Sequence, residues 1–217
     1  MLVVAFDGLL FDTLPLRSAA IAAALSAEGY GITDDMVRDV VASRSIAEAV
    51  RACALISIGA SQHNPSTGAG LDETALDLAT LRAERAAGEV TSRGAVLNVS
   101  MRHRLQRAAT VTRIVVRADS LRRDVEPLLA MAELDSIVSF VRCADDGDRA
   151  TAHGIGSMVE KSYADITRRM AGNMNLLGER SAIGIALELS DSGRAAARML
   201  GFDTPETLSA ATLPGAP

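Results

Sequence analysis

The stretch that decides the fold is LVVAFDGLLFDTLPL, residues 2–16. Its first five residues are apolar and Asp7-Gly8 ends the run, which is typical of a buried parallel strand with polar groups at its carboxyl end. Three more short apolar runs follow at Ile114–Val116, Ile137–Val141 and Ala182–Leu187, separated by helical patterns. Strands that alternate with helices predict an α/β fold with a doubly wound, Rossmann-like parallel sheet.

The region between the first two strands is helical instead. Apolar residues recur at helical spacing over residues 16–28, 36–41, 45–58 and 71–87, and residues 59–70 are polar and glycine-bearing as in a loop. We therefore predict an inserted all-helical cap over 15–91 and an α/β core made of 1–14 and 92–204. Residues 205–217, which contain three prolines, are predicted to be a loose tail.

Composition sets the class of protein. The chain has 217 residues, 48% of them hydrophobic and 23% charged, which is enough to bury a real core and excludes a disordered chain. Cys53 and Cys143 are too few for a disulfide framework, so we expect buried small side chains. A net charge of −5 with 3% aromatic residues argues against nucleic-acid binding.

The sequence also bears on location. No apolar run approaches the roughly 20 residues that span a bilayer, and the N-terminus lacks the basic start of a signal peptide. We expect a cytoplasmic protein without membrane contact. Lys161 is the single lysine among 22 basic residues, and this arginine and alanine bias is typical of GC-rich bacterial genomes.

Four segments in order resemble the motifs of one known family. They are FDGLLFDTLPL (6–16), VVRADSLRR (115–123), KSYAD (161–165) and LELSDSGRAA (187–196). The first resembles Asp-x-Asp-Gly-[Thr/Val]-Leu-x-Asp-[Ser/Thr], the opening motif of the haloacid dehalogenase-like (HAD) hydrolases. The set is similar to the β-phosphoglucomutase and phosphoglycolate phosphatase branch of that superfamily, which carries a helical cap at the place predicted above.

The resemblance implies a phosphoryl-transfer chemistry. In such enzymes a nucleophilic Asp forms an aspartyl phosphate, and a second Asp two residues later acts as acid and base. Mg²⁺ offsets the charge of the transferring group, and a Ser or Thr and a Lys hold its oxygens. Here the acid/base position is Asp7, but the nucleophile position is Ala5, whose methyl group cannot attack phosphorus.

The other three motifs are eroded to different degrees. The Ser or Thr of the second motif aligns with Arg117, or with a neighbour if the alignment shifts by one residue. The third-motif lysine is Lys161. In the fourth motif Glu188 remains, whereas Leu189 replaces the metal-binding Asp. The resemblance therefore implies a vestigial site, in which single catalytic positions are retained but the complete catalytic set is not.

Charge counting predicts that Mg²⁺ binding is lost. Asp7 and Glu188 balance Lys161 and Arg117 without any metal, and these four residues are our candidates for binding a ligand. Asp191 lies two residues beyond the metal position and would need rearrangement to reach a cation. Neither it nor Asp12 replaces a carboxylate at position 5.

Each candidate also has a purely structural interpretation. Asp7 could cap the turn that follows it, and Glu188 with Arg117 could be an internal salt bridge. The three histidines are not spaced as metal ligands and are expected to be exposed to solvent; they are His63, His103 and His153. Arg102, Arg104 and Arg107 form a helix face that we also expect to be solvated.

Two functions remain open from the sequence. The first is a catalytically degenerate, HAD-like pseudo-phosphatase that binds, scaffolds or activates another enzyme of the same bacterial pathway, with a small anionic ligand as a second kind of partner. The second is a divergent hydrolase or phosphomutase acting on a small phosphorylated metabolite, with Asp7 as general base for water and Lys161 and Arg117 holding phosphate.

Overall fold

The computed structural model describes residues 1–42, 44–61, 71–146, 158–174 and 184–205. Their contacts divide the chain into two compact units, one made of Met1–Asp12 and the chain from Val96 onward, the other of Thr13–Ala95. The assignment of residues 15–91 as a cap on the α/β core stays a prediction. The predicted tail falls, from residue 206, outside the described residues, as does most of the predicted loop at 59–70.

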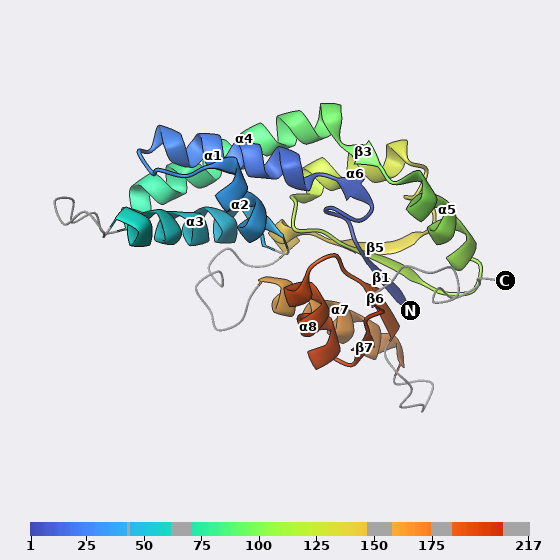
Figure 1. Cartoon of the computed structure of the whole chain (residues 1–217). Helices are drawn as coiled ribbons and strands as arrows, with labels where there is room; N and C mark the ends of the chain where they lie inside the picture. The colour runs from blue at the N-terminus through green and yellow to red at the C-terminus, as the bar shows by residue number, and fades with distance from the viewer. Residues whose placement is uncertain (43, 62–70, 147–157, 175–183, 206–217) are drawn as a thin grey trace. The chain divides into compact units, whose positions relative to one another are not determined.

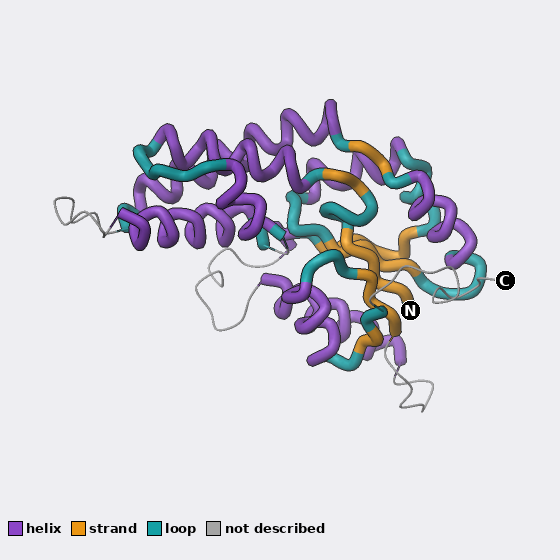
Figure 2. The backbone as a smooth tube through the Cα atoms, viewed as in Figure 1, coloured by secondary structure: helices purple, strands orange, loops and turns teal. Residues whose placement is uncertain are grey.

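The first unit is built on a five-stranded parallel sheet in the order β5-β4-β1-β6-β7 (Figures 1 and 2). Its strands are β1 (Leu2–Ala5), β4 (Ile114–Arg117), β5 (Val138–Arg142), β6 (Gly184–Leu187) and β7 (Phe202–Asp203). All four strand pairings are parallel. The predicted α/β class is confirmed.

Helices cover both faces of this sheet (Figure 1). On one face lie α7 (Met158–Met174) and α8 (Asp191–Met199), and on the other α5 (Val99–Ala108) and α6 (Arg122–Met131). Strand side chains alternate between the faces, so Val3, Val115 and Ala186 meet the apolar sides of α7 and α8 in one buried cluster. The side chains that end β1 and β4 on this same face are Ala5 and Arg117.

A tight loop follows β1 and was not resolved by the sequence pattern. Gly8 has φ 80°, a left-handed conformation that favours glycine, and its N–H donates to the Phe11 carbonyl at 2.7 Å. The loop leads into β2 (Phe11–Asp12), which pairs antiparallel with β3 (Val96–Leu97). A 3₁₀ turn, η1 (Ala144–Asp146), follows β5.

The second unit contains, in its described residues, α1 (Leu14–Ala27), α2 (Asp34–Val41), α3 (Ile46–Ser61) and α4 (Glu73–Gly94) around one apolar core. Ser45 and Glu48 form a reciprocal capping box at the start of α3, and Asp72 caps α4. Two expectations were wrong: α3 runs three residues into the predicted loop, and α4 continues seven residues beyond its predicted end.

Among the described residues, none of the helices combines the length and the apolar character that crossing a bilayer requires.

Candidate functional site

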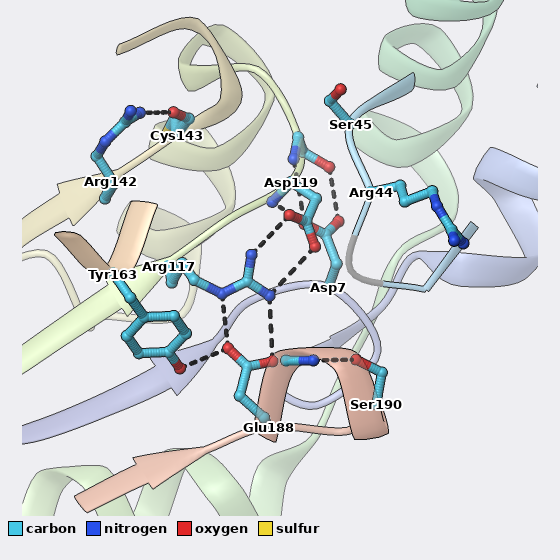
Figure 3. Close-up of polar contacts among 12 residues, drawn as sticks. Asp7, Arg44, Ser45, Arg117, Asp119, Arg142, Cys143, Tyr163, Glu188 and Ser190 are labelled. Carbon is cyan, nitrogen blue, oxygen red and sulfur yellow. Dashed lines mark hydrogen bonds and ion pairs between the residues drawn. The ribbon is translucent and has the colours of Figure 1, made fainter. Parts of the chain in front are cut away.

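The candidate site lies where β4, β1 and β6 end side by side. Ala5 is opposite Arg117 in the β1–β4 register, and Val4 is opposite Leu187 in the β1–β6 register. The residues that follow these strand ends therefore meet at the carboxyl edge of the sheet, the place where open α/β sheets bind ligands. Figure 3 shows that a network of ionic side chains fills this edge.

Arg117 is the centre of the network (Figure 3). Its Nε donates to Glu188 Oε1 at 2.6 Å and its Nη2 to Oε2 at 3.1 Å. On the other side, Nη1 and Nη2 donate to the two carboxylate oxygens of Asp119 at 2.6 and 3.2 Å. The guanidinium is thus held by two carboxylates, each in a two-point arrangement, with Arg117 only 2% exposed.

Tyr163, from α7, completes the contact to Glu188. Its hydroxyl donates to Glu188 Oε1 at 2.6 Å, and its ring lies 5.9 Å from the Arg117 guanidinium carbon. Burial raises the pKa of the Tyr163 hydroxyl well above its ordinary value, and the Glu188 carboxylate raises it further. Burial alone would lower the pKa of Arg117, but Asp119 and Glu188 outweigh it and hold this pKa well above the ordinary value.

Asp7 joins the end of β1 to the loop after β4. Its Oδ2 accepts the backbone N–H groups of Asp119 and Ser120 at 2.7 and 3.1 Å, and its Oδ1 accepts the Ser120 hydroxyl at 2.6 Å. Through these bonds the Asp7 carboxylate anchors the loop that follows β4. Asp7 is 6% exposed.

Glu188 sits tightly against the start of α8. The helix begins after Ser190, whose hydroxyl accepts the N–H of Gly193 at 3.0 Å. A Cβ atom at Gly193 would lie 2.6 Å from Glu188 Oε2, so a glycine is needed for this approach. The N-terminal end of a helix also favours a nearby negative charge.

The remaining predicted site residues are Ala5, Leu189 and Lys161. Ala5 is buried and presents a methyl group, and Leu189 is 48% exposed. Lys161 is half-buried in the first turn of α7, two residues before Tyr163, and its part in ligand binding stays a prediction. Asp191 is exposed and bonds Arg194 within α8.

Other candidates lie away from this network. His103 is exposed, as predicted, whereas His63 and His153 fall outside the described residues. Burial raises the pKa of Cys53 to about 11 and that of Cys143 to about 12, which fits the prediction of buried small side chains. Arg102 forms an ion pair with Glu133 and is only partly solvated.

The donor set does not fit a Mg²⁺ ion. Asp119 and Glu188 each direct both oxygens to Arg117, and the Asp7 oxygens accept three N–H or O–H donors. Leu189 provides no oxygen at the position where the resemblance implies the main ligand. Among the described residues, no three His, Cys, Asp or Glu side chains are grouped as metal ligands.

Sequence reasoning missed two members of the network. Asp119 stands in the second motif two residues after Arg117, and Tyr163 in the third motif two residues after Lys161. Their contacts depend on the pairing of β4 with its neighbours and on the placement of α7. Asp119 adds a third carboxylate to this edge of the sheet, which the predicted charge count of Asp7, Glu188, Lys161 and Arg117 left out.

Comparison with known proteins supports the fold. No protein-family model matches the sequence, and no curated protein matches it. Among solved structures, a predicted phosphoglycolate phosphatase from Haemophilus somnus shares 14% identity at TM-score 0.67, over 94% of this chain and 83% of that one. A Thermotoga maritima protein described as a β-phosphoglucomutase shares 17% at TM-score 0.55, over 96% and 86%.

A HAD-superfamily hydrolase of subfamily IA from Geobacter sulfurreducens shares 14% identity at TM-score 0.51, over 94% of this chain and 84% of that one. Identities this low show the fold and do not transfer an activity. The chain has the fold of the HAD-superfamily phosphatases and phosphomutases.

Proposed function

We propose that this protein is a catalytically degenerate member of the HAD fold that works by binding another protein. The observation that carries the proposal is Arg117, which is clamped between Asp119 and Glu188 at the edge of the sheet where phosphoryl transfer would need a nucleophile and a metal. A guanidinium that is bonded on both sides to carboxylates has few N–H donors left for a substrate.

The covalent route lacks its first reactant. A nucleophilic oxygen at position 5 would have to attack phosphorus, and Ala5 has none. Asp7, the acid/base position, has both oxygens engaged by the loop after β4. We further propose that Mg²⁺ does not bind here, because the carboxylates are already engaged and Leu189 replaces a ligand.

The partner that we propose is an enzyme of the same bacterial pathway. The described part of the chain keeps a well-packed α/β core. If the site no longer supports catalysis, the surface of the protein is the part through which it would act. A small anionic ligand remains a second proposal, with Lys161 as the basic side chain closest in sequence to the network.

The alternative is a divergent hydrolase or phosphomutase that acts on a small phosphorylated metabolite. The comparisons favour it, since the three structures named above are described as a phosphatase, a phosphomutase and a hydrolase. In that case Asp7 would activate water, and Lys161 and Arg117 would hold the phosphate. The site geometry favours the binding role, because Arg117 faces carboxylates and Asp7 faces backbone N–H groups.

A hydrolysis assay separates the two. The purified protein is given p-nitrophenyl phosphate and a panel of sugar phosphates, with Mg²⁺ and with a chelator. We expect phosphate release at the rate of buffer alone, and the same result for Ala5→Asp, because Leu189 and Arg117 are unchanged. Turnover above buffer that is lost in Asp7→Asn, with folding of that variant checked by circular dichroism, would overturn the binding proposal and support the hydrolase.

A further inference from the structure

The bonding of Arg117 resembles that of a metal ion more than that of an ordinary salt bridge. Two carboxylates from different parts of the sheet converge on it, Asp119 from the end of β4 and Glu188 from the end of β6. Four donor–acceptor distances of 2.6 to 3.2 Å join the three side chains. Both carboxylates are nearly inaccessible to water, with side-chain exposures of 2% and 1%.

Buried carboxylates of this kind need a counter-charge. Removing a carboxylate from water costs several kcal/mol, and an unpaired one shifts its pKa or destabilises the fold. With Asp7 nearby, three carboxylates meet at this edge, and Arg117 is the cation that contacts two of them. In a metal site a divalent ion would perform this task; here the chain supplies the cation itself.

We propose that Arg117 is the resident cation of this carboxylate cluster, and that its removal opens a site for a free, planar cation. The shape of the site follows from the bonds, because the two carboxylates present four oxygens to the edges of one flat guanidinium. The proposal does not depend on the proposed function, since it holds equally for a protein that hydrolyses phosphate by another route.

The first test separates charge from bulk at position 117. Arg117→Lys keeps a positive charge and Arg117→Met is neutral with a similar stem, so the two are compared by thermal melting. We expect Arg117→Met to melt about 10 °C below the wild type, as breaking a buried ion pair predicts, and Arg117→Lys to melt clearly between the two. Arg113→Ala, an exposed arginine just before β4, is the matched control and should leave the midpoint unchanged.

The second test asks whether free guanidinium can replace the missing Arg117 side chain. Guanidinium chloride, up to about 50 mM and far below its denaturing range, is added to Arg117→Ala. Its midpoint should rise saturably, by about 3 °C at tenfold the dissociation constant, whereas urea, which is equally flat but neutral, and sodium chloride should not raise it. The wild type should show no rise with guanidinium.

Three results would overturn the proposal. The first is equal midpoints for Arg117→Lys and Arg117→Met, which would make charge irrelevant; this comparison stands even where Arg117→Ala does not fold. The second is a rise of the Arg117→Ala midpoint with urea equal to the rise with guanidinium, which would mean that the site selects for shape and not for charge. The third is the absence of any rise in folded Arg117→Ala. None of these measurements involves phosphate release, so failure here and failure of the proposed function are distinguishable.

Discussion

The role of Asp7 can be decided by replacing it with Ala and with Asn. In the structure its carboxylate accepts the N–H groups of Asp119 and Ser120 and the Ser120 hydroxyl. Asp7→Ala leaves two buried N–H groups without these acceptors, at about 1–3 kcal/mol each, so we expect a loss of about 4 kcal/mol. For a chain of this length that lowers the melting midpoint by about 8–16 °C.

Asp7→Asn should be much milder. Its carbonyl oxygen can take over both N–H groups, and its amide can donate to the Ser120 hydroxyl, which turns to accept. Only the charge assistance is lost, which is worth about 1 kcal/mol or a midpoint lower by about 2–4 °C. An Asp7 that served catalysis alone would predict unchanged or raised stability for both variants.

Urea unfolding followed by far-ultraviolet circular dichroism measures these differences, since the chain has no Trp. Asp12→Ala is the matched control, because Asp12 is an exposed aspartate five residues further on, and its replacement should change stability by less than about 0.5 kcal/mol. The reasoning is refuted if Asp7→Ala is no less stable than Asp12→Ala, or if Asp7→Asn costs as much as Asp7→Ala.

Two more predictions follow from close contacts. Gly193→Ala should lower the melting midpoint by several degrees, because the new Cβ atom would stand 2.6 Å from Glu188 Oε2 and displace that carboxylate; an unchanged midpoint would contradict the tight packing. For Asp146, burial works to raise its pKa, but the bonds from Arg122 and from the Cys143 N–H outweigh burial, so the pKa lies below 3.8. Its stabilisation is present above the unfolded pKa and is lost as the pH falls through the folded value, so Asp146→Asn should lose stability at neutral pH and show a weaker decline on acidification. A melting series from neutral pH to about pH 3 checks this, and parallel declines in the two proteins would count against it.

The four longer strands, β1, β4, β5 and β6, could be predicted from the sequence because each is a short, mainly apolar run between polar or helical segments. The two-residue strands β2, β3 and β7 carry too few residues for any periodicity. The end of α4 was misjudged for a physical reason: Gly88 costs about 1 kcal/mol inside a helix and reads as a stop. Beyond it Thr91 is buried, and this packing carries the helix on to Gly94.

The ion pair of Arg117 with Glu188 could be anticipated, because the motifs place both residues at the ends of neighbouring segments. The bonds from Arg117 to Asp119 could not be anticipated. Asp119 lies in a loop two residues after Arg117, and this spacing does not determine the direction of its side chain. Tyr163 follows only from the packing of α7 onto the sheet, which brings its ring into the cluster with Val115 and Ala186. The sequence pattern therefore does not determine how the loop after β4 and the helix α7 are placed against the ends of the strands.

We propose that the three departures from the motifs that the sequence resembles, Ala5, Arg117 and Leu189, are coupled through this geometry. Arg117 stands opposite Ala5 in the sheet, so the small side chain and the large cation occupy adjacent positions at one edge. An arginine there needs carboxylates on both sides, and its flat fork binds two of them at two points each, which the single ammonium of a lysine cannot do. Once such a cation is held, a divalent ion beside it would be repelled, and a metal-binding Asp at position 189 would have no metal to bind. Leu189, half exposed, is consistent with a position released from that task. In this proposal, the buried Arg117 cation accounts for the alanine at position 5 and the leucine at position 189.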